Sequence, residues 1–284
     1  MSCRNARGAA AALLLGLVFC ATAAGLPAAH RTLAVAHRGA AGLAPENTLA
    51  AFEAGLEHKA DALELDVHLS RDGRLVVIHD AATVRTTNVV GEVGDMTLAD
   101  LRRLDASARY FGSPVPAQRI PTLAEVLELA RGRAAVQVEI KLRSDGTRYP
   151  GIEAAVAEAL RRAGMSGSAT ILSFDFPTLQ EMRRVDPALK TCALISTRYL
   201  ETVGRRGPTA VAAEMAALSV DFVGVDKRWL SEALYRELRG RGLGVGVWTV
   251  DDPAEMLRFR EMGVDFVTSN RPDLLREALA PGRR

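Results

Sequence analysis

Residues 63–69 read LELDVHL, a stretch in which apolar and polar side chains alternate. Successive side chains of a β-strand point to opposite faces, so Glu64, Asp66 and His68 would share one face and the leucines and valine the other. Two interpretations fit this pattern. The strand is amphipathic with its polar side in water, or its polar side faces an enclosed chamber.

The rest of the chain alternates short apolar runs with helical patterns, which favours the second interpretation. Strands are expected at 32–37, 62–69, 134–142, 169–174, 190–196, 221–226, 244–250 and 265–269. Helices are expected at 47–60, 122–132, 151–163, 177–185, 208–218, 231–240, 253–262 and 272–279. Eight such strand–helix units predict an α/β fold of the TIM (β/α)8 barrel type.

A small insertion is expected after the second strand. RLVVIHD (74–80) is interpreted as an extension beside that strand, and residues of about 81–118 form the insertion, with a short helix at 97–104. We expect residues 30–284 to form a single domain of the size typical for such a barrel. An open, doubly wound sheet is the alternative, but no glycine-rich phosphate loop follows the first strand.

Residues 1–29 have the layout of a secretory signal. Arg4 and Arg7 precede a stretch without charge from Gly8 to Ala29, whose centre is apolar. Small residues place the expected cleavage between 23 and 29. The sequence thus predicts an exported protein, periplasmic or secreted, with no stable membrane span after cleavage; an uncleaved, membrane-anchored segment is the alternative.

Charge argues against one class of partner, and cysteine content excludes an internal disulfide. Removal of residues 1–24 takes away Arg4 and Arg7 and leaves 34 basic side chains against 34 acidic ones. Such a balance argues against nucleic acid as a partner. Cys192 is then the last cysteine, so no internal disulfide can form, and its apolar surroundings predict a buried thiol.

Polar residues follow several of the predicted strands at the point where each one ends. His37 and Arg38 end the first strand, and Trp248 closes the seventh. The other strands contribute Glu64 and Asp66, His79 and Asp80, and Glu139 and Lys141. In a barrel the carboxyl ends of the strands meet at one face, where catalytic groups lie. We therefore expect these side chains to form one site.

The charges of this group predict a metal. Glu64, Asp66 and Glu139 bring three negative charges into a partly shielded chamber, against two positive charges from Arg38 and Lys141. The idealised cost of burying one unpaired carboxylate is of order 20 kcal/mol. One divalent cation would leave a net charge of +1, which complements a phosphodiester. Carboxylate oxygens favour Mg²⁺ or Ca²⁺.

The chain resembles the glycerophosphodiester phosphodiesterase family, whose members are metal-dependent TIM-barrel hydrolases. The similarity rests on AHRGAAGLAPENTLAAF (36–52), ELDVHLSRDGRLVVIHD (64–80), VEIK (138–141) and VWTVDD (247–252), in this order, and it extends over residues 33 to 279. The resemblance implies Glu64, Asp66 and Glu139 as metal ligands. It also implies His37 and His79 as the acid–base pair, and Arg38 and Lys141 as phosphate-binding residues.

Several neighbouring residues have simpler explanations. Asn47 has the position and chemistry of a helix N-cap, and together with Glu46 we expect it to support the site rather than to react. Trp248 is either a core residue or a wall of the substrate pocket. His68 is expected around the site or at the surface. Asp80 and Asp251 are interpreted as scaffold residues.

The resemblance implies hydrolysis of glycerophosphodiesters to sn-glycerol 3-phosphate and an alcohol, a small-molecule reaction. Which histidine is the base, and whether the glycerol hydroxyl or water attacks, stay open at this point. Two alternatives remain. One is a phospholipase D-like enzyme that acts on lysophospholipids or sphingomyelin, and the other is a non-catalytic protein that binds glycerophosphodiesters.

Overall fold

Eight parallel strands form a closed barrel in the computed structural model, which describes residues 31–112, 115–280 and 282. The strands are β1 Leu33–Ala36, β2 Ala62–Leu69, β4 Ala135–Ile140, β5 Ala169–Ser173, β6 Lys190–Ile195, β7 Phe222–Asp226, β8 Gly244–Trp248 and β9 Phe266–Ser269. The barrel closes because β1 pairs in parallel with both β2 and β9. The predicted TIM-barrel fold is confirmed.

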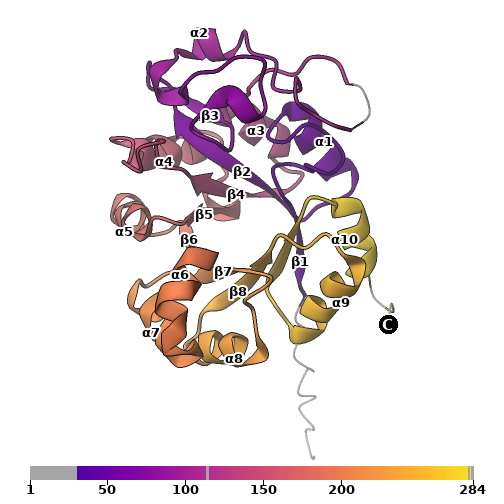
Figure 1. Cartoon of the computed structure of the whole chain (residues 1–284), viewed down its shortest axis with the longest axis vertical. Coiled ribbons are helices and arrows are strands. Elements are labelled where there is room, and N and C mark those ends of the chain that lie inside the picture. Colours follow the sequence, from indigo (N-terminus) through magenta and orange to yellow (C-terminus); the bar gives the residue numbers. More distant parts are fainter. Residues whose placement is uncertain (1–30, 113–114, 281, 283–284) are drawn as a thin grey trace, which may run out of the picture. The chain divides into compact units, whose positions relative to one another are not determined.

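Helices surround the strands, as Figure 1 shows. They are α1 Leu49–Glu57, α3 Leu123–Ala130, α4 Ile152–Arg162, α5 Phe176–Val185, α7 Pro208–Ala217, α8 Glu232–Gly240, α9 Pro253–Met262 and α10 Pro272–Ala278. A further short helix, α6 Thr197–Thr202, follows β6 and was not predicted. It begins after Ser196, whose hydroxyl caps it by accepting from the Tyr199 N–H.

Both faces of β2 are buried, which settles the question raised by LELDVHL. Leu63, Leu65 and Val67 belong to the large apolar cluster that also contains residues of the surrounding helices. Side chains alternate along a strand, so Glu64 and Asp66 face the barrel interior. The polar side of this strand therefore looks into an enclosed chamber.

The barrel interior below this chamber is filled by apolar side chains. Phe222 and Phe266 meet edge to face with ring centroids 5.9 Å apart, and Cys192 is buried in the same cluster, as predicted. Gly246 leaves the room that Phe266 needs, because a Cβ atom there would lie only 1.9 Å from the ring. This packing closes the lower part of the barrel.

The insertion leaves the barrel at the end of β2. Strand β3 Leu75–Val77 pairs antiparallel with the last residues of β2, so the chain returns toward the barrel before it enters two 3₁₀ turns, η1 Thr83–Arg85 and η2 Val93–Asp95. Helix α2 Leu98–Leu101 is shorter than the predicted helix at 97–104. A separate apolar core stabilises the insertion: Val76, Ile78, Val93, Leu101, Leu104, Ala106 and Ile120.

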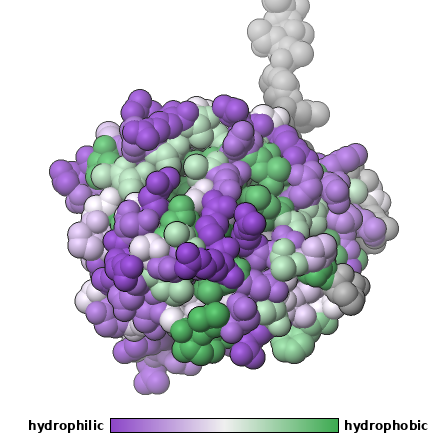
Figure 2. All heavy atoms as spheres, turned by 90° about the horizontal axis from the view of Figure 1, so that it is seen from above, coloured by the Kyte–Doolittle hydropathy of each residue, from purple (hydrophilic) through white to green (hydrophobic). Residues whose placement is uncertain are grey.

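The face of the molecule that carries the insertion is mainly hydrophilic. Seen from this side in Figure 2, hydrophobic residues lie scattered among hydrophilic ones. Among residues 31–112, 115–280 and 282, no helix is long and apolar enough to cross a bilayer. The predicted signal at 1–29 lies outside the described residues.

Candidate active site

Three buried carboxylates lie together at the mouth of the barrel. Glu64 and Asp66 come from β2 and Glu139 from β4, and the parallel register of these strands places Asp66 beside Glu139. One carboxylate oxygen of each residue lies within 4.8 Å of the others. The exposed fractions of Glu64, Asp66 and Glu139 are 4%, 1% and 7%, so these carboxylates have almost no contact with solvent water.

The cluster needs more positive charge than the protein supplies. Burial, together with Asp66 and Glu139, raises the pKa of Glu64 well above its usual value. Burial also raises the pKa of Glu139, although the Lys141 ammonium lies 2.7 Å from its Oε1 atom. A group of hard oxygen atoms with incomplete charge compensation fits a divalent cation. The three carboxylates would hold it.

The loop after β1 directs two groups toward this cluster. Arg38 has a left-handed backbone (φ +50°), and its N–H donates to Glu64 Oε2 at 2.8 Å. Gly39 follows with φ +92°, and a Cβ atom there would lie 2.7 Å from the backbone of Phe52. The loop therefore requires glycine at this position. The Arg38 Nε atom is buried and has no hydrogen-bond partner among the described residues, which suits an anion.

His37 is fixed by an amide rather than by a carboxylate. Its Nδ1 atom donates to Asn270 Oδ1 at 2.7 Å, and Asn270 in turn donates to Asp251 from its backbone N and its Nδ2. This bond leaves Nε2 on the side of Glu64, 3.9 Å from Oε2. Burial, followed by the charge of Arg38, lowers the pKa of His37 from 6.5 to about 4. The imidazole is therefore neutral and can accept a proton.

His79 lies on the other side of the cluster. Its Nδ1 atom donates to Asp80 Oδ1 at 2.6 Å, while Lys141 Nζ donates to its Nε2 at 3.2 Å. His68 is buried in β2, which excludes the expected surface position. Its Nε2 donates to the backbone oxygen of His79 at 3.1 Å, and Tyr149 lies 3.0 Å from its Nδ1. Asp80 and His68 thus hold His79.

Glu46 and Asn47 lie beside the cluster, but one prediction about them is wrong. The N-cap of α1 is Thr48, whose hydroxyl accepts from the Ala51 N–H. Asn47 instead adopts φ +56° and donates from Nδ2 to Asp66 Oδ2 at 2.8 Å. Glu46 accepts a hydrogen bond from Arg38. An acceptable capping side chain at two adjacent positions made the sequence ambiguous by one residue.

An apolar wall completes the pocket. The cavity has a volume of about 120 Å³. Its charged and histidine lining residues are His37, Arg38, Glu64, His79 and Glu139, and the other lining residues are Leu172, Phe174, Leu194, Trp248, Thr249, Phe266 and Thr268. Trp248 thus borders the pocket, and the Phe174 ring meets it edge to face at 5.5 Å. The Trp248 Nε1 atom is buried without a partner among the described residues.

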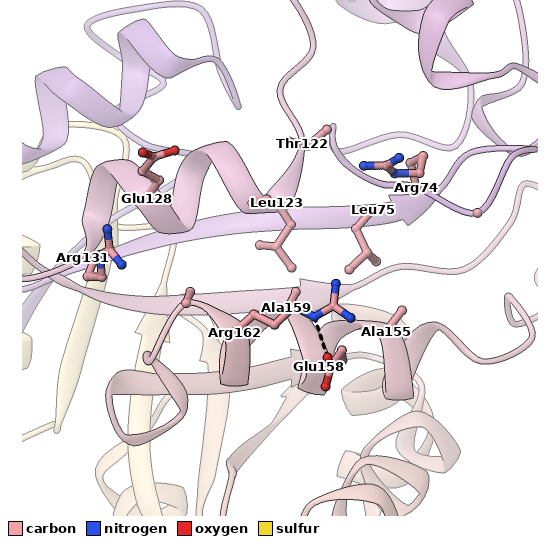
Figure 3. Close-up of a pocket in the computed structure, with 13 residues that line it drawn as sticks. Arg74, Leu75, Thr122, Leu123, Glu128, Arg131, Ala155, Glu158, Ala159 and Arg162 are labelled. Atoms are coloured by element: carbon pink, nitrogen blue, oxygen red, sulfur yellow. Dashed lines mark hydrogen bonds and ion pairs between the residues drawn. The ribbon is translucent and has the colours of Figure 1, made fainter.

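Larger hollows lack the cluster of carboxylates and histidines, including one of about 510 Å³ that borders Glu46 and Arg85 beside the insertion. A groove of about 490 Å³ runs between α3 and α4, with Leu75, Leu123 and small alanines lining it (Figure 3). Its rim carries arginines and glutamates, of which Arg162 and Glu158 form an ion pair. None of its lining residues is a histidine. The candidate active site is therefore the small pocket at the barrel mouth.

Sequence reasoning missed one residue of this site. Asn270 accepts from His37 and was not considered, whereas Asp251, which was interpreted as a scaffold residue, holds Asn270. Asn270 directly follows β9, and a polar residue at a strand end was the available signal. The predicted site residues all lie at or beside the pocket, whereas their individual roles stay predictions.

Comparisons with known proteins agree with this geometry. The model of the Glycerophosphoryl diester phosphodiesterase family matches residues 37–274. The chain belongs to this family. A family member from Caldanaerobacter subterraneus, described as glycerophosphodiester phosphodiesterase, is 36% identical over 245 residues, which cover 86% of this chain and 96% of the relative.

Solved structures in this family have the same fold. A glycerophosphodiester phosphodiesterase from Agrobacterium tumefaciens is 31% identical, with a TM-score of 0.72 over 87% of this chain and 99% of that one. A phosphodiesterase from Oleispira antarctica is 25% identical, with a TM-score of 0.74 over 88% and 97%. The latter was solved in complex with its product, sn-glycerol-3-phosphate.

Proposed function

We propose that this protein hydrolyses glycerophosphodiesters to sn-glycerol 3-phosphate and an alcohol. The observation that carries this proposal is the enclosure of three carboxylates and two histidines in one pocket. Relatives that share the fold over almost their whole length are named for this activity. The protein is accordingly a phosphoric diester hydrolase.

Arg38 and Lys141 are suited to hold the phosphoryl group. The Arg38 Nε–H makes no hydrogen bond to the described residues, although it lies 3.8 Å from Asp66 Oδ2, and it can donate to a phosphate oxygen. The Lys141 ammonium lies between the carboxylates and His79. A divalent cation, for which we propose Mg²⁺ or Ca²⁺, would neutralise charge on the phosphoryl oxygens when bound by Glu64, Asp66 and Glu139. Together these groups stabilise the added charge of the transition state.

His37 and His79 are suited to move the protons. Hydrolysis forms a bond from phosphorus to the attacking oxygen and breaks the bond to the leaving alcohol. One proton leaves the attacking hydroxyl or water, and another must reach the leaving oxygen. Each histidine is held through Nδ1, so these transfers fall to Nε2. Nε2 of His79 accepts from Lys141 Nζ at 3.2 Å, and this contact must give way when His79 takes part. Attack by water gives both products in one step, whereas attack by the glycerol hydroxyl releases the alcohol and forms a cyclic phosphate, which water must open in a second step.

The pocket suits a small polar group. Its volume is about 120 Å³, and carboxylates, histidines and Arg38 line it, as a glycerol phosphate group requires. The insertion carries exposed apolar side chains, among them Val90 and Phe111. We favour soluble glycerophosphodiesters over lysophospholipids because the relatives are named for them, and a comparison of soluble with acylated substrates tests this choice.

Purified protein tests this proposal directly. With Mg²⁺ or Ca²⁺ it should release glycerol 3-phosphate from glycerophosphocholine and glycerophosphoethanolamine, and chelation should stop release reversibly. His79→Ala and Glu64→Ala should abolish turnover, while Arg162→Ala in the outer groove should not. Binding of intact substrate without product over hours would instead identify a non-catalytic binding protein.

We propose further that the protein is exported. The support is the uncharged stretch from Gly8 to Ala29 behind Arg4 and Arg7. Expression of the full chain in a bacterial host, followed by cell fractionation and intact-mass measurement, tests this. A product that begins between residues 24 and 30, outside the cytoplasm, is the expected result. Full-length protein in the cytoplasm would refute it.

A further inference from the structure

Arg85 contacts the carboxylates that hold two active-site residues. It is the last residue of η1, in the insertion. Its NH1 and NH2 atoms donate to the two oxygens of Glu46, at 2.9 and 2.6 Å, and its Nε donates to Asp80 Oδ2. One guanidinium therefore joins the loop after β1 to the segment after β3.

Each of these carboxylates contacts a side chain of the pocket. Glu46 Oε1 also accepts from Arg38 NH1 at 2.9 Å. The other oxygen of Asp80, Oδ1, accepts from His79 Nδ1 at 2.6 Å. The result is a continuous chain of hydrogen bonds from Arg38 through Glu46, Arg85 and Asp80 to His79, from one side of the pocket to the other.

The geometry gives this chain rigidity. A guanidinium is planar, and it uses a different N–H for each of three carboxylate oxygens here. Arg38 and Glu46 have exposed side-chain fractions of only 17% and 19%, so solvent screens this part of the chain little. The turn that carries Arg85 is itself fixed, because Thr83 Oγ1 donates to the Val89 and Gly91 backbone oxygens.

Arg85 itself does not line the catalytic pocket. Its effect on the reaction must pass through Glu46 and Asp80. Without Arg85, Asp80 would keep its hydrogen bond from His79 and would be free to rotate with it. Glu46 would turn toward Arg38 alone and draw it away from the phosphate position. Both displacements weaken transition-state contacts without removing any reacting group.

We propose that Arg85 is a positioning residue that sets Arg38 and His79 in a common geometry for catalysis. The proposal rests on the hydrolase function proposed above. It makes the insertion part of the catalytic machinery, because the turn that carries Arg85 belongs to that segment. Loss of such supporting contacts typically reduces activity by about 10 to 100-fold.

Kinetics of Arg85→Ala and Arg85→Lys with glycerophosphocholine test the proposal. We expect kcat to fall by roughly 10 to 100-fold in the alanine variant. Lysine should restore only part of it, because one ammonium cannot bond three oxygens at once. Guanidinium ion added to the alanine variant should raise kcat toward the wild-type value. Arg102→Ala is the matched control, since Arg102 binds Glu125 away from the pocket.

Combined variants separate positioning from direct contact with the substrate. If Arg85 acts through its two carboxylates, Arg85→Ala should cost much less in the Asp80→Asn background than in the wild type. An unchanged cost in the Glu46→Gln/Asp80→Asn background, or wild-type kcat in Arg85→Ala, would overturn the proposal. Circular dichroism melting confirms that each variant is folded. An inactive wild type would refute the hydrolase function instead.

Discussion

The two histidines of the pocket have different partners behind them. Asp80, a carboxylate, accepts from His79, whereas the amide of Asn270 accepts from His37. Both partners fix the ring through Nδ1, but only Asp80 adds charge, and Nε2 of His79 also accepts from Lys141. Burial and the charge of Arg38 lower the pKa of His37, although its hydrogen bond to Asn270 acts in the opposite direction. Both rings are thus held at the same nitrogen atom, but one lies against a neutral amide and the other against a negative carboxylate.

Asn270→Ala tests the orientation of His37. Without the amide acceptor the ring can rotate, and we expect kcat to fall roughly 10 to 100-fold, as for other supporting contacts of an active site. Steady-state kinetics with glycerophosphocholine measure this. Asn88→Ala is the matched control, because Asn88 accepts only from the Asp105 N–H in the insertion. Equal kcat in the two variants would show that Asn270 does not position His37.

Glu64→Gln tests the carboxylate cluster without relying on turnover. Removing one of three charged ligands should weaken binding of Mg²⁺ or Ca²⁺ severely. Because metal binding to the folded state stabilises it, the wild type should melt at a higher temperature when either ion is added. The variant should lose that increase, and calorimetric titration should show reduced affinity. A wild-type response in the variant would place the metal elsewhere.

Sequence patterns predicted the charged residues of the site better than their partners. Glu139 stands near the end of β4, whereas Glu64 and Asp66 were expected late in their strand but lie inside β2, which continues to pair with β3. The parallel register of β2 and β4 brings the three carboxylates together. Asn270 contacts His37, and Asp251 contacts Asn270, only through the side-chain geometry of the loops after β8 and β9. Local patterns contain no information on such contacts, which is why the second layer of the site was missed.

At the level of elements, strand and helix periodicity was informative because the barrel buries both faces of its strands. The predicted strand at 62–69 matches β2 residue for residue. Short elements were less predictable. Helix α6 has six residues, too few for an apolar period to stand out, and its capping hydroxyl at Ser196 was the main signal.

The start of α3 provides a prediction about stability. Thr122 and Glu125 form a capping box, in which the hydroxyl accepts from the Glu125 N–H and the carboxylate accepts from the Thr122 N–H. Thr122→Ala should lower the free energy of unfolding by about 1 kcal/mol and leave kcat unchanged. Urea unfolding measures this. Thr202→Ala, which removes only exposed bonds to backbone oxygens, should cost clearly less.

At the scale of the whole molecule, His68 links the barrel to the insertion. This residue belongs to β2, donates to the backbone oxygen of His79 behind β3, and contacts Tyr149 in the loop after β4. Burial, with a contribution from Lys141, lowers the pKa of His68 from 6.5 to about 4. A neutral imidazole thus holds three segments together.

This arrangement predicts acid sensitivity. The unfolded chain binds a proton at His68 near pH 6.5, and the folded chain only near pH 4, so acidification between these values favours unfolding. The stabilisation is complete above pH 6.5 and gone below pH 4, and its full size is on the order of 3 kcal/mol. His68→Gln removes the imidazole that binds this proton and leaves every other titrating group in place.

Urea unfolding of both metal-free proteins at several pH values provides the measurement. Wild type should lose its free energy of unfolding more steeply than His68→Gln between pH 6.5 and 4, because the shared groups cancel in the difference. A constant offset between the two curves would reflect lost packing alone. Parallel curves over this range would therefore show that His68 is not held neutral, and that the link between barrel and insertion does not depend on its protonation state.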